Sequence, residues 1–183
     1  LILSEPSNPW IAGSSALFTR EFHALCRSRL KPGGVAGAWL PGQAISLGDA
    51  RAAAAAFIET YPHSAVFEGH FDNYFFFGSD SPLRFDLQAY SLALQSEPVA
   101  RTLARIGYRG NPSLPLAGFI CLGRDLRPFI RDAPLTDDTS ALEFSAWRER
   151  GRSESAAILE LLLRAEKDLF ETIAPIPEGR ERL

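Results

Sequence analysis

The first 40 residues constrain the fold more than any other part of the chain, because short apolar runs flank one amphipathic segment. Residues 1–3 are typical of a buried parallel strand, and the two prolines in residues 5–9 would end it, since proline donates no ladder hydrogen bond. A helix is expected to begin at Ser14 or Ser15, and a second strand is expected over residues 35–40. Strand, helix and strand in this order predict a right-handed βαβ unit.

The first helix is expected to bury one face. Its large apolar side chains recur every three or four residues, which is the spacing of a single helix face. These residues are Phe18, Phe22, Leu25, Cys26 and Leu30.

The next 40 residues continue the alternation of helices and strands. Ser46 is a good N-cap for an alanine-rich helix that Pro62 would end. Residues 65–69 and 74–77 then predict two strands joined by an Asp-Asn turn, and the three phenylalanines of the second are typical of a strand covered on both faces. The sequence therefore predicts an α/β domain that ends in a hairpin.

The second half of the chain has a different character. Residues 83–183 are expected to form a mainly helical extension of an α/β part that occupies residues 1–82. Helices are expected over residues 86–106, with a break before Pro98, and over residues 114–130. A short extended piece is expected at Leu142, Glu143 and Phe144. The last expected helix covers residues 153–173, with Ser153 as its cap.

Charge and composition exclude several functions. Nineteen basic and twenty-two acidic residues give a net charge of −3, and no basic patch interleaved with aromatic residues suggests a nucleic-acid partner. The three histidines are dispersed and the two cysteines, Cys26 and Cys121, lie in apolar contexts, so no metal site is expected. No run of about 18 apolar residues predicts a membrane span.

Three ordered segments resemble the spermidine synthase family of aminopropyltransferases: EPSNPWIAGSSALFTREF followed by RLKPGG, then GSDSPLRFDL at residues 78–87, then APLTDDTSALEF at residues 133–144. The likeness is greatest to bacterial spermidine-synthase-like proteins that often carry a membrane-spanning region upstream. It implies the C-terminal half of a Rossmann-like S-adenosylmethionine-dependent methyltransferase sheet, with the final strand inserted antiparallel in the last hairpin, followed by a helical tail. It also implies a cytoplasmic protein or the soluble domain of an inner-membrane protein.

The resemblance assigns roles to the residues after the first strand, where ligands bind in open α/β sheets. By position Glu5 takes the place of the family's proposed catalytic base, Ser7 that of a hydroxyl residue and Asn8 that of a second Asp. Pro9 takes the place of the proline near the adenine, and Trp10 would either wall the pocket or fill the core. Asn8 cannot carry a negative charge, which weakens one anchor for a diamine.

A carboxylate at residue 5 suits an amine substrate, because it attracts an ammonium ion and can accept the proton that must leave before nitrogen attacks carbon. The expected reaction moves an aminopropyl group from decarboxylated S-adenosylmethionine to an amine such as putrescine, without a metal. Two alternatives stay open, namely methyl transfer from S-adenosylmethionine and a catalytically degenerate ligand-binding or interaction module. Asp137 and Asp138 match the family's Thr-Asp-Asp segment and would approach the site or serve as turn residues.

The family's Gly-rich cofactor loop and its ribose-binding acidic residue do not occur in this sequence, which also contains no methionine. The chain is therefore expected to be a piece of a longer protein and to be inactive alone. An upstream half, a partner chain or a second copy in a homodimer would complete the sheet.

Overall fold

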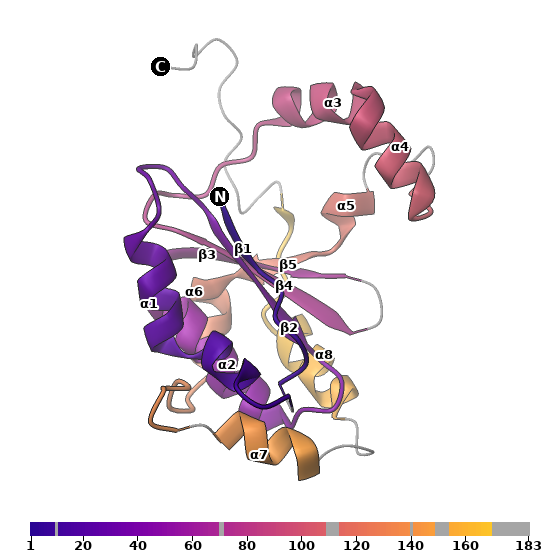
Figure 1. Ribbon diagram of the computed structural model, residues 1–183. Coiled ribbons are helices and arrows are strands. Elements are labelled where there is room, and N and C mark those ends of the chain that lie inside the picture. Colours follow the sequence, from indigo (N-terminus) through magenta and orange to yellow (C-terminus); the bar gives the residue numbers. More distant parts are fainter. Residues whose placement is uncertain (10, 70–71, 109–113, 140, 149–153, 170–183) are drawn as a thin grey trace.

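Five strands form one mixed sheet at the centre of the molecule (Figure 1). The computed structural model describes residues 1–9, 11–69, 72–108, 114–139, 141–148 and 154–169. The strands are β1 (Ile2–Ser4), β2 (Ala36–Pro41), β3 (His63–Glu68), β4 (Asn73–Ser79) and β5 (Phe119–Leu122), in the spatial order β1-β2-β4-β3-β5.

The pairing of the strands confirms the predicted βαβ unit and the hairpin. β1 and β2 are parallel, with Leu3 opposite Gly37, and the helix α1 (Arg20–Ser28) connects them. β4 lies between β2 and β3 and is antiparallel to both, so the last strand of the hairpin is inserted into the sheet. β5 extends the sheet on the far side of β3 and runs antiparallel to it.

The main core lies between one face of the sheet and α2 (Leu47–Thr60), which packs beside α1. Ser46 caps α2 as predicted, since its hydroxyl accepts a hydrogen bond from the Asp49 amide at 3.0 Å. The small alanine side chains of α2 are buried and let the helix approach the strands closely. The ring of Phe57 packs at a tilt against that of Phe76 of β4, with the ring centroids 5.6 Å apart.

The start of α1 differs from the prediction. Ser14 and Ser15 begin a short 3-10 helix, η1 (Ser14–Phe18), and Thr19 is the residue that caps α1. Thr19 has an extended backbone, so η1 and α1 are two separate helices. The apolar side chains before and after Thr19 therefore do not share the single helix face that was predicted. As a result Leu25 is 56% exposed, whereas His23 is only 4% exposed.

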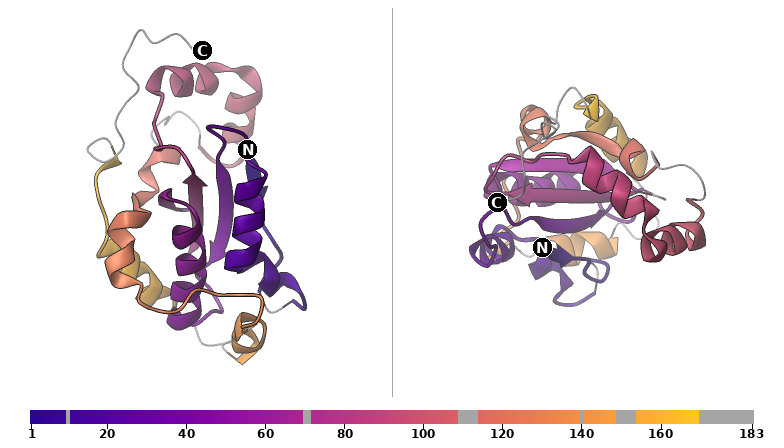
Figure 2. Two further views of the ribbon diagram at one scale, coloured as in Figure 1. Left: turned by 90° about the vertical axis from the view of Figure 1, so that its left-hand side faces the viewer. Right: turned by 90° about the horizontal axis from the view of Figure 1, so that it is seen from above.

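The helices α3 (Leu87–Gln95) and α4 (Glu97–Arg105) confirm the break expected before Pro98. Neither helix contains a buried residue. Figures 1 and 2 show this pair at one end of the molecule and α7 (Ala141–Arg148) at the other.

Two predictions for the second half are wrong. Residues 119–122 form β5 rather than helix, flanked by the short helices α5 (Leu114–Ala117), α6 (Gly123–Leu126) and η2 (Arg127–Phe129). The predicted extended piece at Leu142, Glu143 and Phe144 lies within α7.

The final helix is also shorter than predicted. α8 (Ser155–Leu163) ends ten residues before residue 173, because the chain beyond it bonds to the sheet through the Lys167 amide, which donates to the Ile120 carbonyl at 2.8 Å. Ser153, the predicted cap of this final helix, and residues 170–173 lie outside the described residues.

The second face of the sheet is only partly covered. Alternation along β3 places Ala65 on this face and Val66 in the main core. Over β3 and β5 a smaller apolar cluster covers it, formed with Leu83, Phe85, Leu116 and Leu169. Over β1, β2 and β4 none of the described segments covers this face, and the candidate site lies there.

Candidate functional site

The open part of the second face forms an apolar cavity of about 340 Å³. Register places Leu3, Gly37 and Phe77 side by side across β1, β2 and β4. Leu1 and Leu3 are 82% and 66% exposed, which is unusual for two leucines at one end of a sheet. The cavity is lined by Leu1, Leu3, Ser4, Glu5, Gly37, Ala38, Trp39, Phe75 and Phe77.

The floor of the cavity depends on Gly37. A Cβ atom at this position would lie 2.6 Å from Leu3 Cδ2 and 3.2 Å from Phe77 Cε1. Glycine therefore allows the side chains of the two neighbouring strands to approach each other above β2. Any larger residue would push them apart or fill the cavity.

One wall is the indole ring of Trp39, which pairs across the sheet with Phe75. The Trp39 Nε1–H donates a hydrogen bond to Asn73 Oδ1 at 2.7 Å, and this bond fixes the orientation of the ring. Trp39 is half-buried, and it lines the cavity while also packing against the main core.

Glu5 is the only ionisable side chain among the described residues that line the cavity. It is exposed and directly follows Ser4, the last residue of β1. An ammonium group near this carboxylate would keep contact with water while an attached apolar body lay against Trp39 and Phe75. The arrangement can therefore bind an amine, and Glu5 can take a proton from it.

The other predicted site residues do not line this cavity. Ser7 is exposed, and Asn8 is half-buried with its carbonyl accepting a hydrogen bond from the Ile11 amide at 2.9 Å. Pro9 is fully buried, so its ring serves packing. Trp10 lies outside the described residues. Of the predicted residues that are described, the structure brings only Glu5 to the cavity.

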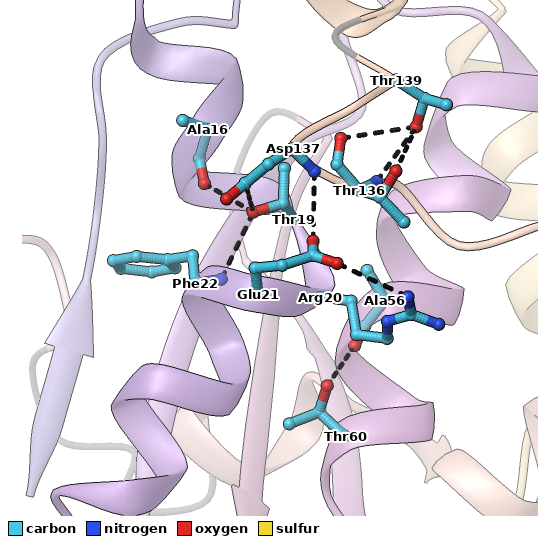
Figure 3. Close-up of polar contacts among 10 residues, drawn as sticks. All are labelled: Ala16, Thr19, Arg20, Glu21, Phe22, Ala56, Thr60, Thr136, Asp137 and Thr139. Carbon is cyan, nitrogen blue, oxygen red and sulfur yellow. Dashed lines mark hydrogen bonds and ion pairs between the residues drawn. The ribbon is translucent and has the colours of Figure 1, made fainter.

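Asp137 joins the start of α1 rather than the cavity (Figure 3). The Thr19 hydroxyl donates to Asp137 Oδ1 at 2.7 Å and accepts from the Phe22 amide at 3.3 Å. The Asp137 amide in turn donates to Glu21 Oε2 at 3.1 Å. Hydrogen bonds from the backbone amides of Glu21 itself and of Asp137, aided by Arg20, hold the pKa of the Glu21 carboxyl below its ordinary value. Of the two roles considered for Asp137, the structure shows the turn and capping role.

The first of the three segments that carry the sequence resemblance is hydrogen-bonded to each of the other two. The Ser79 hydroxyl donates to the Gly34 carbonyl at 2.8 Å, which ties the end of β4 to the first segment. Glu143 Oε2 accepts from the Ser15 hydroxyl at 3.2 Å and from the Gly13 amide at 3.3 Å. These contacts explain why the three segments belong to one structural unit, and they lie apart from the residues that line the cavity.

Sequence reasoning missed the aromatic wall of the cavity. Phe75 and Phe77 are half-buried on the open face, which corrects the expectation that β4 is covered on both sides. Alternate residues of β2 and β4 pair across the sheet and form this wall, but the sequence predicts which residues pair only when the register between the two strands is known.

Within the described part of the chain, no three or more His, Cys, Asp or Glu side chains are grouped to hold a metal ion. No helix in the same residues combines the length and apolar character needed to cross a membrane. No protein-family model matches the sequence, and no curated protein or solved structure is significantly similar to it.

Proposed function

We propose that this chain is the C-terminal part of a spermidine-synthase-like transferase, which moves an aminopropyl group from decarboxylated S-adenosylmethionine to an amine. The observation that carries the proposal is the position of Glu5, a lone carboxylate on the rim of an apolar cavity at the carboxyl end of β1. This is where an open α/β sheet binds its ligands.

The strand order supports the same proposal. A parallel β1–β2 pair followed by an antiparallel β4 between β2 and β3 is the arrangement that the resemblance implies for the second half of a methyltransferase-type sheet. β5 is an addition to that pattern, on the far side of β3.

In the proposed reaction the neutral amine nitrogen attacks the carbon bonded to the sulfonium sulfur. The carbon–sulfur bond breaks, and its electron pair leaves with the sulfur as a neutral thioether. Glu5 accepts the proton that the new ammonium group loses. The sulfonium already activates the carbon, so placing nitrogen and carbon in line supplies much of the rate.

The charge of the cavity lining limits which amines can bind there. Putrescine carries two ammonium groups, but the lining offers one carboxylate, and Asn8 stands where the family has a second acidic residue. A second ammonium would lose its hydration among Trp39, Phe75 and Phe77 without a counter-charge. An amine with one charged end and an apolar body fits better than a diamine.

A second candidate is a binding module without turnover. It is favoured by the finding that the described lining of the cavity has no ionisable side chain besides Glu5, and so no second side chain there to carry a proton. Such a module would bind the same amines and leave them unchanged.

One experiment separates the two candidates. The protein is expressed in the longest form that its gene encodes. Binding is measured by titration with hexylamine and with putrescine. Transfer of an aminopropyl group from decarboxylated S-adenosylmethionine, or of a methyl group from S-adenosylmethionine, is then assayed with the same amines. Glu5→Gln should lower aminopropyl transfer by about 100-fold or more, the range of a general base. Glu59→Gln, an exposed glutamate on α2, is the matched control.

Binding of hexylamine without transfer from either donor would establish the module, and transfer from S-adenosylmethionine alone would establish a methyltransferase. Failure of both amines to bind, or equal transfer by Glu5→Gln and wild type, would refute the role of Glu5.

A further inference from the structure

Aromatic side chains gather in the cavity beside Glu5. Trp39 and Phe75 are direct partners across β2 and β4, and Phe77 lies two residues further along β4 on the same face of the sheet. All three side chains are half-buried and line the cavity. A molecule bound there would therefore meet three aromatic rings in the described lining.

Two of these rings are held in place by residues outside the cavity lining. The hydrogen bond from Trp39 Nε1–H to Asn73 Oδ1 orients the indole. The ring of Phe77 makes a T-shaped contact with Phe67 of β3, with the ring centroids 5.6 Å apart, and Phe67 makes a second T-shaped contact with Phe119 of β5 at 5.4 Å. Rings that are already ordered lose little conformational entropy when a ligand packs against them.

The polar side chains of the described lining lie at one end of it. Ser4 and Glu5 are consecutive residues at the end of β1. The other polar side-chain atom of this lining, Trp39 Nε1, already donates to Asn73. A hydroxyl or a second charge on the far end of a ligand would lose its hydration without gaining a partner among the aromatic side chains. The lining therefore suits an ammonium group at Glu5 and a body that carries no polar group.

Strand geometry sets the separation between the carboxylate and the apolar floor. Glu5 follows Leu3 by two residues, which span about 7 Å of extended chain. Leu3 is opposite Gly37, which is in turn opposite Phe77, so Leu3 and Phe77 form the floor together. A short alkyl arm extending from an ammonium group at Glu5 covers this distance and places the group that it carries over the floor.

We propose that the amine bound in this cavity is an arylalkylamine, in which a short alkyl arm joins the ammonium group to an aromatic ring without polar substituents. The inference rests on the proposed function, since it names the class of amine that the site beside Glu5 takes. Aromatic pairs attract each other beyond the effect of the area that they bury, so the three rings favour an aromatic body over a saturated one. Trp39 determines this specificity, because its indole is the largest of the three rings and is already oriented.

The test is calorimetric titration of the longest form that the gene encodes with 2-phenylethylamine, 2-cyclohexylethylamine and hexylamine. Each of these amines carries one ammonium group. The phenyl and cyclohexyl compounds have the same number of carbon atoms, and the saturated ring buries at least as much apolar area, so burial alone gives no preference for the phenyl compound. Wild type should bind 2-phenylethylamine about two- to tenfold more tightly than 2-cyclohexylethylamine, which is the contribution of an aromatic pair.

Four variants separate the ring from the charge. Trp39→Leu should bring the ratio of the two affinities close to one, whereas Trp39→Phe, which retains a ring, should keep most of the preference. Glu5→Gln should weaken the binding of all three amines and leave the ratio unchanged. Phe144→Leu removes a ring that is 67% exposed on α7, outside the cavity lining, and should bind all three amines like wild type.

A circular dichroism melt checks the fold of each variant, and the comparison of ligands on wild type decides the class of amine without any substitution. Equal binding of the phenyl and cyclohexyl compounds, with hexylamine also bound, would overturn the arylalkylamine class and leave the proposed function intact. An unchanged ratio in a folded Trp39→Leu variant would overturn the role of Trp39. If none of the three amines bound, the amine site itself would be refuted, and the proposed function with it.

Discussion

Acidification should destabilise this protein through His23. The side chain is 4% exposed and lies between the rings of Phe22 and Phe57, with centroid distances of 5.6 Å and 5.0 Å. Burial lowers the pKa of His23 from 6.5 to about 4, because an imidazolium would lose its hydration there. Between these two values the unfolded chain binds a proton that the folded chain does not bind. Stability from this group is therefore complete above pH 6.5 and is lost as the pH falls toward 4.

The size of the effect follows from the two pKa values. A shift from 6.5 to about 4 corresponds to about 3 kcal/mol of unfolding free energy at 1.36 kcal/mol per unit. Most of it, about 2.5 kcal/mol, should be lost by pH 4.5. This is a large fraction of the stability of an ordinary domain.

The assay is urea unfolding at several values between pH 7.5 and pH 4.5, followed by tryptophan fluorescence. His23→Gln removes the titrating group. Between pH 7.5 and pH 4.5 the unfolding free energy of this variant should therefore fall by about 2.5 kcal/mol less than that of wild type. Equal pH dependence in wild type and His23→Gln would show that the reasoning about burial is wrong.

Three further predictions concern the sheet and its helix. Gly37→Ala should weaken amine binding and lower the unfolding free energy by about 1–3 kcal/mol, because the added methyl group would overlap Leu3. An amine titration measures the first effect, and urea unfolding measures the second. Thr19→Ala should cost about 1 kcal/mol through loss of the N-cap of α1, while Thr19→Ser should not, as thermal melts would show. Asn73→Ala should shift the fluorescence of the chain by freeing the Trp39 indole, whereas an unchanged spectrum would argue against the bond.

Much of the first half of the fold could be predicted from the sequence, because local signals and tertiary pairing agree there. Ser46 and Pro62 mark the limits of α2 in both, and Asp72 lies between β3 and β4 as predicted, although Asn73, the other predicted turn residue, is the first residue of β4. Residues 119–122 could not be assigned, because four consecutive apolar residues fit a buried strand as well as a helix, and only the free edge of β3 decides between them.

The parts of the candidate site were predictable to different degrees. The location of Glu5 followed from the general rule that ligands bind beyond the ends of strands. The aromatic wall and the Gly37 floor could not be predicted, because they depend on the register between β2 and β4 and on a face that nothing in the described residues covers.

The helices α3 and α4, which bury no residue, have a consequence for local stability. Regions with few buried apolar contacts open at a small fraction of the global unfolding free energy. Backbone amides of these two helices should therefore exchange with deuterium through openings that leave the sheet intact, while the amides of α2 exchange only on global unfolding. A protease should make its first cut in this pair, and the nicked protein should keep the sheet and the cavity beside Glu5.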